Sequence, residues 1–210
     1  MVREHLEKLW ERLSVPNIKE EMPEARREFL ARSGEVIEDD PSFDVRMASF
    51  LDWFLFERPL DSSRLTPLEL LLDSNSLTEA ERAICEQFAG NVHSVFLVRK
   101  LRENQVELQD LFTKKTYPVS LTENALLSAF QRNSLVQGRI LPLNGEYFLS
   151  PALFFHPREV RKIVEQEIKR LKKEGETSPL ALIHQLMVMH LKWERYRNFK
   201  IKDIYLFGKK

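Results

Sequence analysis

The sequence is poor in the residues that mark the commonest metal and nucleotide sites. Its 210 residues include one cysteine, Cys85, and six glycines. A single cysteine excludes an internal disulfide and a cysteine-rich zinc site, and it fits a reducing compartment. The glycines form no G-x-G or Walker pattern, which argues against the common nucleotide-binding loops. The sequence therefore predicts neither a cofactor nor a metal.

Long apolar runs are also missing. A helix needs ~20 mostly apolar residues to span a bilayer. The aromatic-rich stretch Phe50–Leu60 (FLDWFLFERPL) is much shorter and is interrupted by Asp52, Glu57 and Arg58. The N-terminus carries charges throughout and lacks the apolar region of a signal peptide. We therefore expect a cytoplasmic protein without a membrane span.

The charge is balanced overall but unevenly placed. Residues 1–156 hold 18 basic and 25 acidic side chains, a net charge of −7, whereas residues 157–210 hold 14 and 7, a net charge of +7. A basic C-terminal segment is typical of a nucleic-acid or membrane arm, and equally of two halves that attract each other.

Helical patterns fill residues 1–90. Apolar residues recur at helical spacing from Leu6 to Leu13, and a second helix is expected from Pro23 to Arg32. A third is expected to begin with Asp40 as its N-cap and to end at Pro59. The starts of two more are marked by threonine caps with glutamate three residues later, Thr66 with Glu69 and Thr78 with Glu81.

The pattern changes to β-strand at Asn91. Five short strands are expected before residue 157, and the Asn-Gly pair at 144–145 predicts a hairpin. The segment TENALLSAFQRN, residues 122–133, is expected to form a helical turn or a loop. Five short strands are too few for a large sandwich, so we expect a small antiparallel sheet or a partly open barrel.

Two helices are expected after the strands, over residues 157–173 and 179–199, and each begins at a proline. The apolar tail IYLF is expected to pack back or to add a strand. The predicted fold class is α+β: a helical block over 1–90, a small β domain over 91–156 and basic C-terminal helices over 157–210. The three parts are either separate or one compact unit.

No residue pattern points to catalysis, so we expect no catalytic residue. His184 and His190 stand about 240° apart on one helix, which does not suit a metal pair. An enzyme assembled from scattered residues is a third hypothesis. A pocket lined by carboxylates or histidines with shifted pKa values would be its first support.

The basic C-terminal helices are the candidate binding surface. Aromatic rings interleave with their charges, as in nucleic-acid surfaces that use charge for phosphate and rings for stacking. Glutamates dilute the charge, so a solvated or protein-facing surface is the favoured interpretation, ahead of nucleic acid, and an acidic lipid or nucleotide is a further one. The candidate residues are Arg158, Arg161, Lys162, Lys169, Arg170, Lys192 and Arg195.

Aromatic residues are the candidate anchors for a protein partner, because such rings dominate binding hot spots. Most of Phe50–Leu60 is nevertheless expected to be core, since a helix that is apolar on most sides is buried on most sides. The candidate anchors are Trp53, Phe56, Trp193 and Tyr196.

Four stretches together resemble a family of uncharacterised bacterial proteins: FLDWFLFERPLDSSRLTPLELLL, LTEAERAI, LQDLFTKKTYPVS and LVQGRILPLNGEYFLSP. That family shares a D-W-F-L-F-[DE]-x-P-L stretch, a helix pair and a small β domain with a G-R-[IL]-[LV]-P strand. Some members carry a cysteine-rich SEC-C metal motif, which this chain lacks, so the resemblance implies no zinc here. It spans residues 50–153 and implies no activity.

The sequence therefore favours a non-enzymatic interaction or regulatory protein that docks onto a protein partner through a helix or a sheet edge. A homodimer through the apolar face of the last helix is one form of that docking. The alternative is a nucleic-acid-binding protein that uses the basic C-terminal helices.

Overall fold

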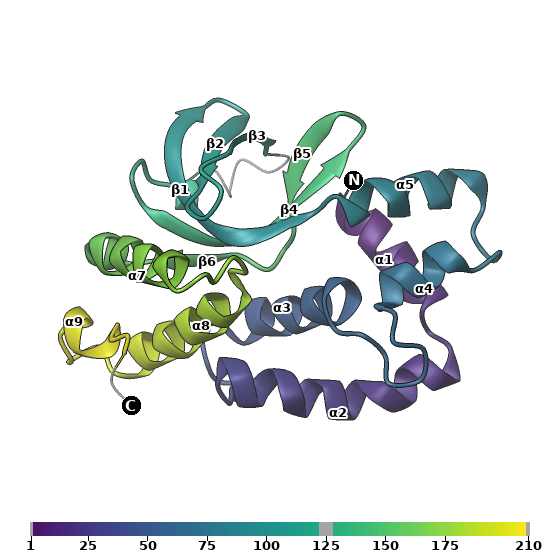
Figure 1. The fold of residues 1–210 in the computed structure, drawn as a ribbon, viewed down its shortest axis with the longest axis horizontal. Helices are drawn as coiled ribbons and strands as arrows, with labels where there is room; N and C mark the ends of the chain where they lie inside the picture. Colours follow the sequence, from purple (N-terminus) through teal and green to yellow (C-terminus); the bar gives the residue numbers. More distant parts are fainter. Residues whose placement is uncertain (1, 122–127, 209–210) are drawn as a thin grey trace.

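The structure is a computed structural model that describes residues 2–121 and 128–208. These residues form eight α-helices, one short 3-10 helix and a six-stranded mixed sheet (Figure 1). The expected α+β class, with helices at both ends of the chain, is confirmed. The turn or loop expected over residues 122–133 lies partly outside the described residues.

The N-terminal helices follow the sequence signals closely at α4 and α5. In both, the threonine side chain accepts the backbone N–H of the glutamate, and the glutamate accepts the backbone N–H of the threonine, so both capping boxes form. The five helices are α1 (Val2–Arg12), α2 (Pro16–Ser33), α3 (Phe43–Phe56), α4 (Pro67–Asp73) and α5 (Glu79–Ala89).

Two expected helix starts are wrong. Helix α2 begins at Pro16, where the missing N–H of proline costs nothing, and Pro23 lies inside the helix. Helix α3 begins after Ser42 rather than after Asp40. The carboxylate of Asp40 instead accepts the N–H of Ile37 at 2.8 Å and pairs with Arg195 at 2.6 Å, so it is not available as a cap.

The sheet holds one more strand than expected. Its last strand has three residues, too few for a period-two pattern to be recognised. The strands are β1 (Val92–Arg102), β2 (Gln105–Asp110), β3 (Thr116–Ser120), β4 (Leu135–Leu143), β5 (Glu146–Leu149) and β6 (Phe154–His156).

Five of the strands close into a ring. Strand β1 pairs antiparallel with β2 and β4, β2 with β3, and β4 with β5. Strand β3 runs parallel to β5, joined at Val119 and Tyr147, which departs from the expected antiparallel pattern. The order β1-β2-β3-β5-β4-β1 is that of the five-stranded Greek-key barrel called the OB-fold. Strand β6 adds to β4 outside the ring.

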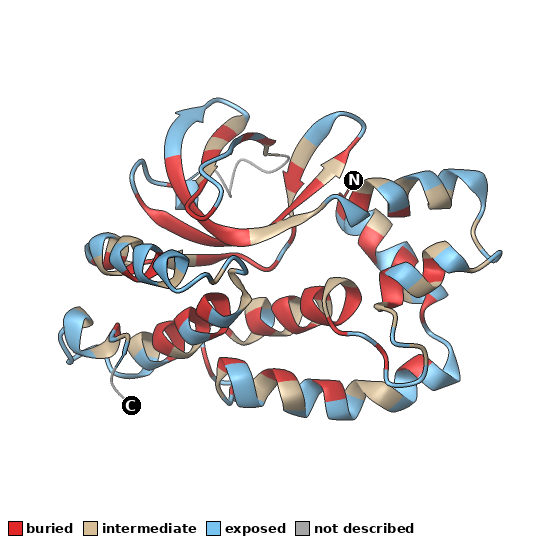
Figure 2. Ribbon diagram, in the orientation of Figure 1, coloured by how far each residue is buried: buried red, intermediate tan, exposed pale blue. Residues whose placement is uncertain are grey.

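The two faces of β1 and β4 contribute to two hydrophobic cores, one inside the barrel and one among the helices. Because successive strand residues point to opposite faces, Phe96 and Val98 fill the barrel, whereas Val95 and Leu97 pack among the helices. Figure 2 shows the buried residues gathered on the inward sides of α3, α8 and the strands. The barrel and the helices therefore share strands rather than a linker.

The C-terminal helices complete the helical side. They are the 3-10 helix η1 (Arg158–Val160), α7 (Arg161–Lys173), α8 (Leu180–Arg195) and α9 (Ile201–Ile204). Helix α8 contacts both α2 and β1, so it is central to the molecule (Figure 1). The C-terminal tail packs back onto the protein, which is one of the two alternatives expected from the sequence. Its Tyr205 is fully buried.

The aromatic stretch at the end of α3 is mostly core, as expected. Phe50, Trp53, Phe54 and Leu55 are each 5% exposed or less. No helix in the described part of the chain combines the length and the apolar character that a bilayer-spanning segment needs.

Candidate functional site

The C-terminal end of α3 meets β1 and β4 in a buried ion cluster, here called the junction cluster: Asp52, Glu57, His93 and Arg139. Arg139 donates to Glu57 Oε1 at 2.5 Å, and its Nε lies 3.6 Å from Asp52 Oδ2. Nδ1 of His93 lies 2.6 Å from the same oxygen of Glu57. The guanidinium of Arg139 also stacks on the ring of Phe56, 4.6 Å from its centroid. The cluster thus ties the helices to the barrel.

Gly138 makes room for this arrangement. A Cβ at this position would lie 2.6 Å from Leu153 Cδ2 and 2.9 Å from the carbonyl oxygen of Ala152. Only glycine therefore allows the segment after β5 to cross β4 so closely. Because strand residues alternate between faces, the next residue, Arg139, points to the helical side.

The two carboxylates of the junction cluster titrate in opposite directions. Burial opposes the charge on Glu57, but His93 and Arg139 together lower its pKa to about 2. Burial raises the pKa of Asp52, against the effect of Arg139 and of a hydrogen bond from Ser150. The cluster therefore holds its firm negative charge on Glu57. A carboxylate with so low a pKa is a poor general base near neutral pH.

Besides Arg139 Nε, which faces Asp52, two buried polar atoms in or beside this cluster lack hydrogen-bond partners among the described residues. They are Oε2 of Glu57 and Nε2 of His184, a residue near the start of α8. Burial lowers the pKa of His184 to about 4, so its imidazole is neutral near pH 7. Buried polar atoms in native proteins are nearly always hydrogen-bonded. These two are therefore candidates for contact with a ligand.

Glu57 and His184 both line a pocket of about 520 Å³ between α2, α3 and α8, here called the junction pocket. One wall is Trp53, which the guanidinium of Arg32 approaches to 5.8 Å from the ring centroid. The remaining lining residues are Glu28, Arg58, Pro59, Leu180, Ala181 and Gln185.

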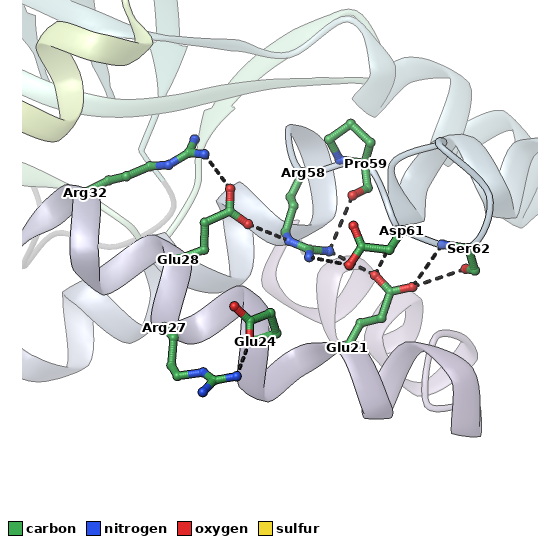
Figure 3. Close-up of polar contacts among 9 residues, drawn as sticks. All are labelled: Glu21, Glu24, Arg27, Glu28, Arg32, Arg58, Pro59, Asp61 and Ser62. Atoms are coloured by element: carbon green, nitrogen blue, oxygen red, sulfur yellow. Dashed lines mark hydrogen bonds and ion pairs between the residues drawn. The ribbon is translucent and has the colours of Figure 1, made fainter.

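The rim of the junction pocket is a chain of ion pairs, which Figure 3 shows. Arg58 donates to Glu28 at 3.0 Å and to Glu21 at 2.9 Å, and Arg32 donates to the other oxygen of Glu28 at 2.5 Å. Asp61 lies 3.3 Å from Arg58. Each rim arginine therefore has a carboxylate partner, and these two arginines face three carboxylates, of which Asp61 is mostly exposed.

The described residues offer no cluster of three or more histidine, cysteine or carboxylate side chains for a metal ion. Cys85 is buried in α5, and burial raises its pKa to about 11. A thiol with such a pKa is a poor nucleophile.

A second hollow, here called the α2–α3 groove, has a volume of about 910 Å³ and lies between the exposed sides of α2 and α3. Its lining is apolar apart from two arginines, Arg26 and Arg27, which are exposed. The apolar lining residues are Met22, Pro23, Leu30, Met47, Phe50 and Leu51.

The basic residues singled out in the sequence are spread over η1, α7 and α8. Three of the arginines have acidic partners: Arg161 with Glu165 at 2.9 Å, Arg170 with Glu167 and Glu174 at 2.6 Å, and Arg195 with Asp40 at 2.6 Å. The other four, Arg158, Lys162, Lys169 and Lys192, are exposed.

The four candidate anchors lie in different surroundings. Trp53 is 3% exposed and lines the junction pocket. Phe56 and Trp193 are half-buried beneath the guanidinium groups of Arg139 and Arg197. Tyr196 is 54% exposed.

Sequence reasoning missed the junction cluster. One signal was present: Asp52 and Glu57 stand in a helix that is apolar on most sides, so each must be buried or nearly so. Buried carboxylates need a cation or several hydrogen bonds. The pattern does not say which of 32 basic residues supplies it.

The geometry defines an α+β protein in which a closed five-stranded barrel is joined to a helical layer through a buried ion cluster. Residues 2–180 match the model of a family described as a family of unknown function, DUF7986, and the chain belongs to that family. Membership of an uncharacterised family is thus confirmed. Neither the curated proteins nor the solved structures include a match to this chain.

Proposed function

We propose that the chain is a non-enzymatic interaction protein of the bacterial cytoplasm, which binds an acidic amphipathic helix of a protein partner in the α2–α3 groove. The groove carries the proposal because it is large, open and lined by apolar side chains. Helix-in-groove recognition uses such surfaces. Two of the lining residues, Met22 and Met47, have flexible side chains that adapt to a partner.

The charge of the groove selects the acidic partner. Its lining includes Arg26 and Arg27 but no carboxylate among the described residues. Arg27 pairs with Glu24, whereas Arg26 is exposed and is the side chain we expect to meet an acidic residue of the partner. Complementary charge at the rim of an interface speeds association and selects partners.

A photo-crosslinking experiment in the native host tests this proposal. A photoreactive amino acid at Met47 should crosslink repeatedly to one protein, within a segment of helical spacing that carries acidic residues. Arg26→Glu should reduce the crosslinked product about tenfold, since it places like charges opposite each other. Lys19→Glu is the matched control, because Lys19 is exposed on the same helix but does not line the groove.

Three results would contradict the proposal. They are the absence of a reproducible crosslink, a crosslinked segment that is basic, and equal yields from the two charge-reversal variants.

Homodimerisation through the apolar face of α8, the last helix expected from the sequence, stays a prediction. Three residues of that face, Leu182, Leu186 and Met189, are buried within the chain, and the fourth, Trp193, is half-buried. Light scattering after size-exclusion chromatography measures the oligomeric state directly.

The junction pocket has one feature that the enzyme hypothesis predicts, which is a set of titratable groups with shifted pKa values, but the shifts do not suit acid–base catalysis. The junction pocket is lined by a carboxylate and a histidine with shifted pKa values. Both shifts move away from neutrality, with Glu57 at about 2 and His184 at about 4, whereas general acid–base groups work best near the operating pH. The pocket therefore favours binding over proton transfer.

Nucleic-acid binding is the second candidate, and one observation favours it. Tyr196 and Phe199 are 54% and 62% exposed and stand edge to face, 5.8 Å apart. Exposed cations surround this pair in the chain: Lys192, Arg197, Lys200 and Lys202. Exposed rings among cations suit a single strand, whose bases stack while its phosphates meet the charges.

The barrel itself does not support this candidate. OB-folds bind oligonucleotides on the face of β2 and β3. Here the outward positions of these strands carry no aromatic ring: Gln105, Glu107, Gln109, Thr116, Pro118 and Ser120. A labelled single-stranded oligonucleotide should therefore bind at Tyr196 and Phe199 and lose affinity steeply with added salt. The variant Phe199→Ala should no longer bind it. Binding that survives Phe199→Ala would contradict this candidate.

A further inference from the structure

We propose that the junction pocket binds a small α-amino acid with an apolar side chain, held by its ammonium and carboxylate groups. This inference is independent of the proposed function, because the pocket and the α2–α3 groove share no lining residue.

The ammonium group is assigned to Glu57. One oxygen of this carboxylate is occupied by His93 and Arg139, whereas Oε2 is buried without a partner among the described residues. An ionised carboxylate oxygen only accepts hydrogen bonds. The ligand must therefore present a donor, and a charged N–H makes the strongest such bond.

The carboxylate group is assigned to the start of α8. Leu180 and Ala181, the first two residues of this 16-residue helix, line the same pocket. The N–H of Leu180 already donates to Ser178 Oγ at 3.3 Å, so the N–H groups of Ala181 and Leu182 are the ones left for an anion. The helix dipole also favours an anion there. The adjacent His184, 8% exposed and with an unpaired Nε2, gives a second polar contact that points to a ligand.

Charge balance favours a zwitterion over a simple amine or acid. The buried and half-buried charges around the pocket pair off as Glu57 with Arg139, Arg58 with Glu21, and Arg32 with Glu28. Asp61, the further carboxylate on Arg58, is 71% exposed and solvated. A ligand with net charge would leave one charge without compensation in a partly buried site, which is costly. A molecule that carries both signs meets Glu57 and the helix end at once.

The walls of the pocket set the preference for an apolar side chain. Trp53, Pro59 and Leu180 supply the apolar surface. The volume of about 520 Å³ is within the range of small-molecule sites. Amino acids of the size of leucine, methionine or phenylalanine therefore suit it best.

Isothermal titration calorimetry of the full chain at pH 7.5 tests the inference. L-leucine, L-methionine and L-phenylalanine are titrated individually, and at least one should bind saturably at a single site. Two analogues of leucine remove one charged group each: 3-methylbutylamine lacks the carboxylate, and 4-methylpentanoate lacks the ammonium. Each should bind at least tenfold more weakly than leucine.

Two variants locate the binding. Ala181→Glu adds a negative charge at an exposed position of the pocket mouth and should weaken amino-acid binding at least tenfold. Gln166→Glu is the matched control, because it adds the same charge at an exposed position of α7 outside the pocket and should change nothing. His184→Phe keeps a ring of similar size and should also weaken binding, since it removes the polar contact.

The inference is overturned if none of the three amino acids gives a saturable signal. It is equally overturned if an analogue with one charged group binds as well as leucine, or if Ala181→Glu and Gln166→Glu leave the affinity the same.

Discussion

The two ends of α8 bury histidines in different surroundings. At the N-terminal end, His184 lies beside the Glu57–Arg139 ion pair and lines an open pocket. At the C-terminal end, His190 is enclosed by rings, with centroids 5.4 Å from Phe154, 5.6 Å from His156 and 5.5 Å from Trp193. Each histidine has one nitrogen without a hydrogen bond in the described structure: Nε2 of His184, and Nδ1 of His190, which lies 3.5 Å from Glu194 Oε2. Only His184 also lines a cavity, so the cavity and not the missing hydrogen bond distinguishes a binding site.

The enclosed end holds the tail of the chain. His156 Nε2 lies 3.3 Å from the side-chain oxygen Oε1 of Gln137, so this nitrogen donates. Nδ1 then accepts the hydroxyl of Tyr205 at 3.1 Å. Burial lowers the pKa of His156 well below its ordinary value. The hydrogen bonds that hold Tyr205 at this end are therefore made by neutral groups, although Arg46 and Glu194 are charged and lie nearby. The pocket end is held by paired charges. The two ends should respond differently to loss of a charge.

The largest effect should come from breaking the ion pair at the pocket end. Arg139→Met leaves the carboxylates of Glu57 and Asp52 buried without their cation. Removing one partner of a buried ion pair costs about 3–5 kcal/mol. We expect a loss of that size in the free energy of unfolding, measured by urea denaturation at pH 7.

Arg158→Met is the control for this prediction. Arg158 is exposed, and exposed substitutions usually change the stability by less than about 0.5 kcal/mol. If the two methionine variants are equally stable, the junction cluster does not hold the barrel to the helices.

Lowering the pH should reduce the free energy of unfolding, because the buried histidines are neutral in the folded chain and take up protons when it unfolds. The pKa of His184 is about 4 in the folded chain against an ordinary value of 6.5, so below pH 6.5 the unfolded chain binds more protons. Stability from this group is therefore complete above pH 6.5 and is lost as the pH falls towards 4. Between pH 7 and pH 5 the loss is about 2 kcal/mol for His184. His156 acts in the same direction.

Urea denaturation of the unsubstituted protein and of His184→Phe, each at pH 7 and at pH 5, measures the contribution of His184 to the free energy of unfolding. The variant should lose less stability between pH 7 and pH 5, by about the 2 kcal/mol assigned to His184. The same comparison cancels the contribution of Asp52, whose raised pKa acts in the opposite direction over part of this range. Equal losses in the two proteins would show that His184 is not held neutral.

The contrast between the two ends also shows what the sequence could predict. Local signals were reliable: Thr66 and Thr78 cap their helices, and the aromatic stretch of α3 is core. These features depend on residues within a few positions of each other. The junction cluster joins Glu57 to Arg139 across 82 positions, and only closure of the barrel on the helices brings them together.

The same reasoning explains the remaining errors. Asp40 has the residue type and position of a helix cap, but Arg195, 155 positions away, takes its carboxylate. The basic residues of α7 do alternate with acids as the sequence shows, and two of the candidate arginines there, Arg161 and Arg170, are consequently paired. A pairing partner far along the chain leaves no periodic signal.

The smallest effect should come from the enclosed end. Tyr205→Phe removes the hydroxyl that donates to His156 and leaves Nδ1 without a partner, while it keeps the buried ring. The loss of one hydrogen bond at a buried neutral group costs about 1 kcal/mol. Tyr196→Phe is the matched control, because Tyr196 is 54% exposed and its hydroxyl meets water. A drop in unfolding free energy at Tyr205 but not at Tyr196 would show that the neutral network fastens the tail. Because this network contains no ion pair, the drop should be the same at low and at moderate salt, and a salt-dependent drop would contradict the distinction between the two ends of α8.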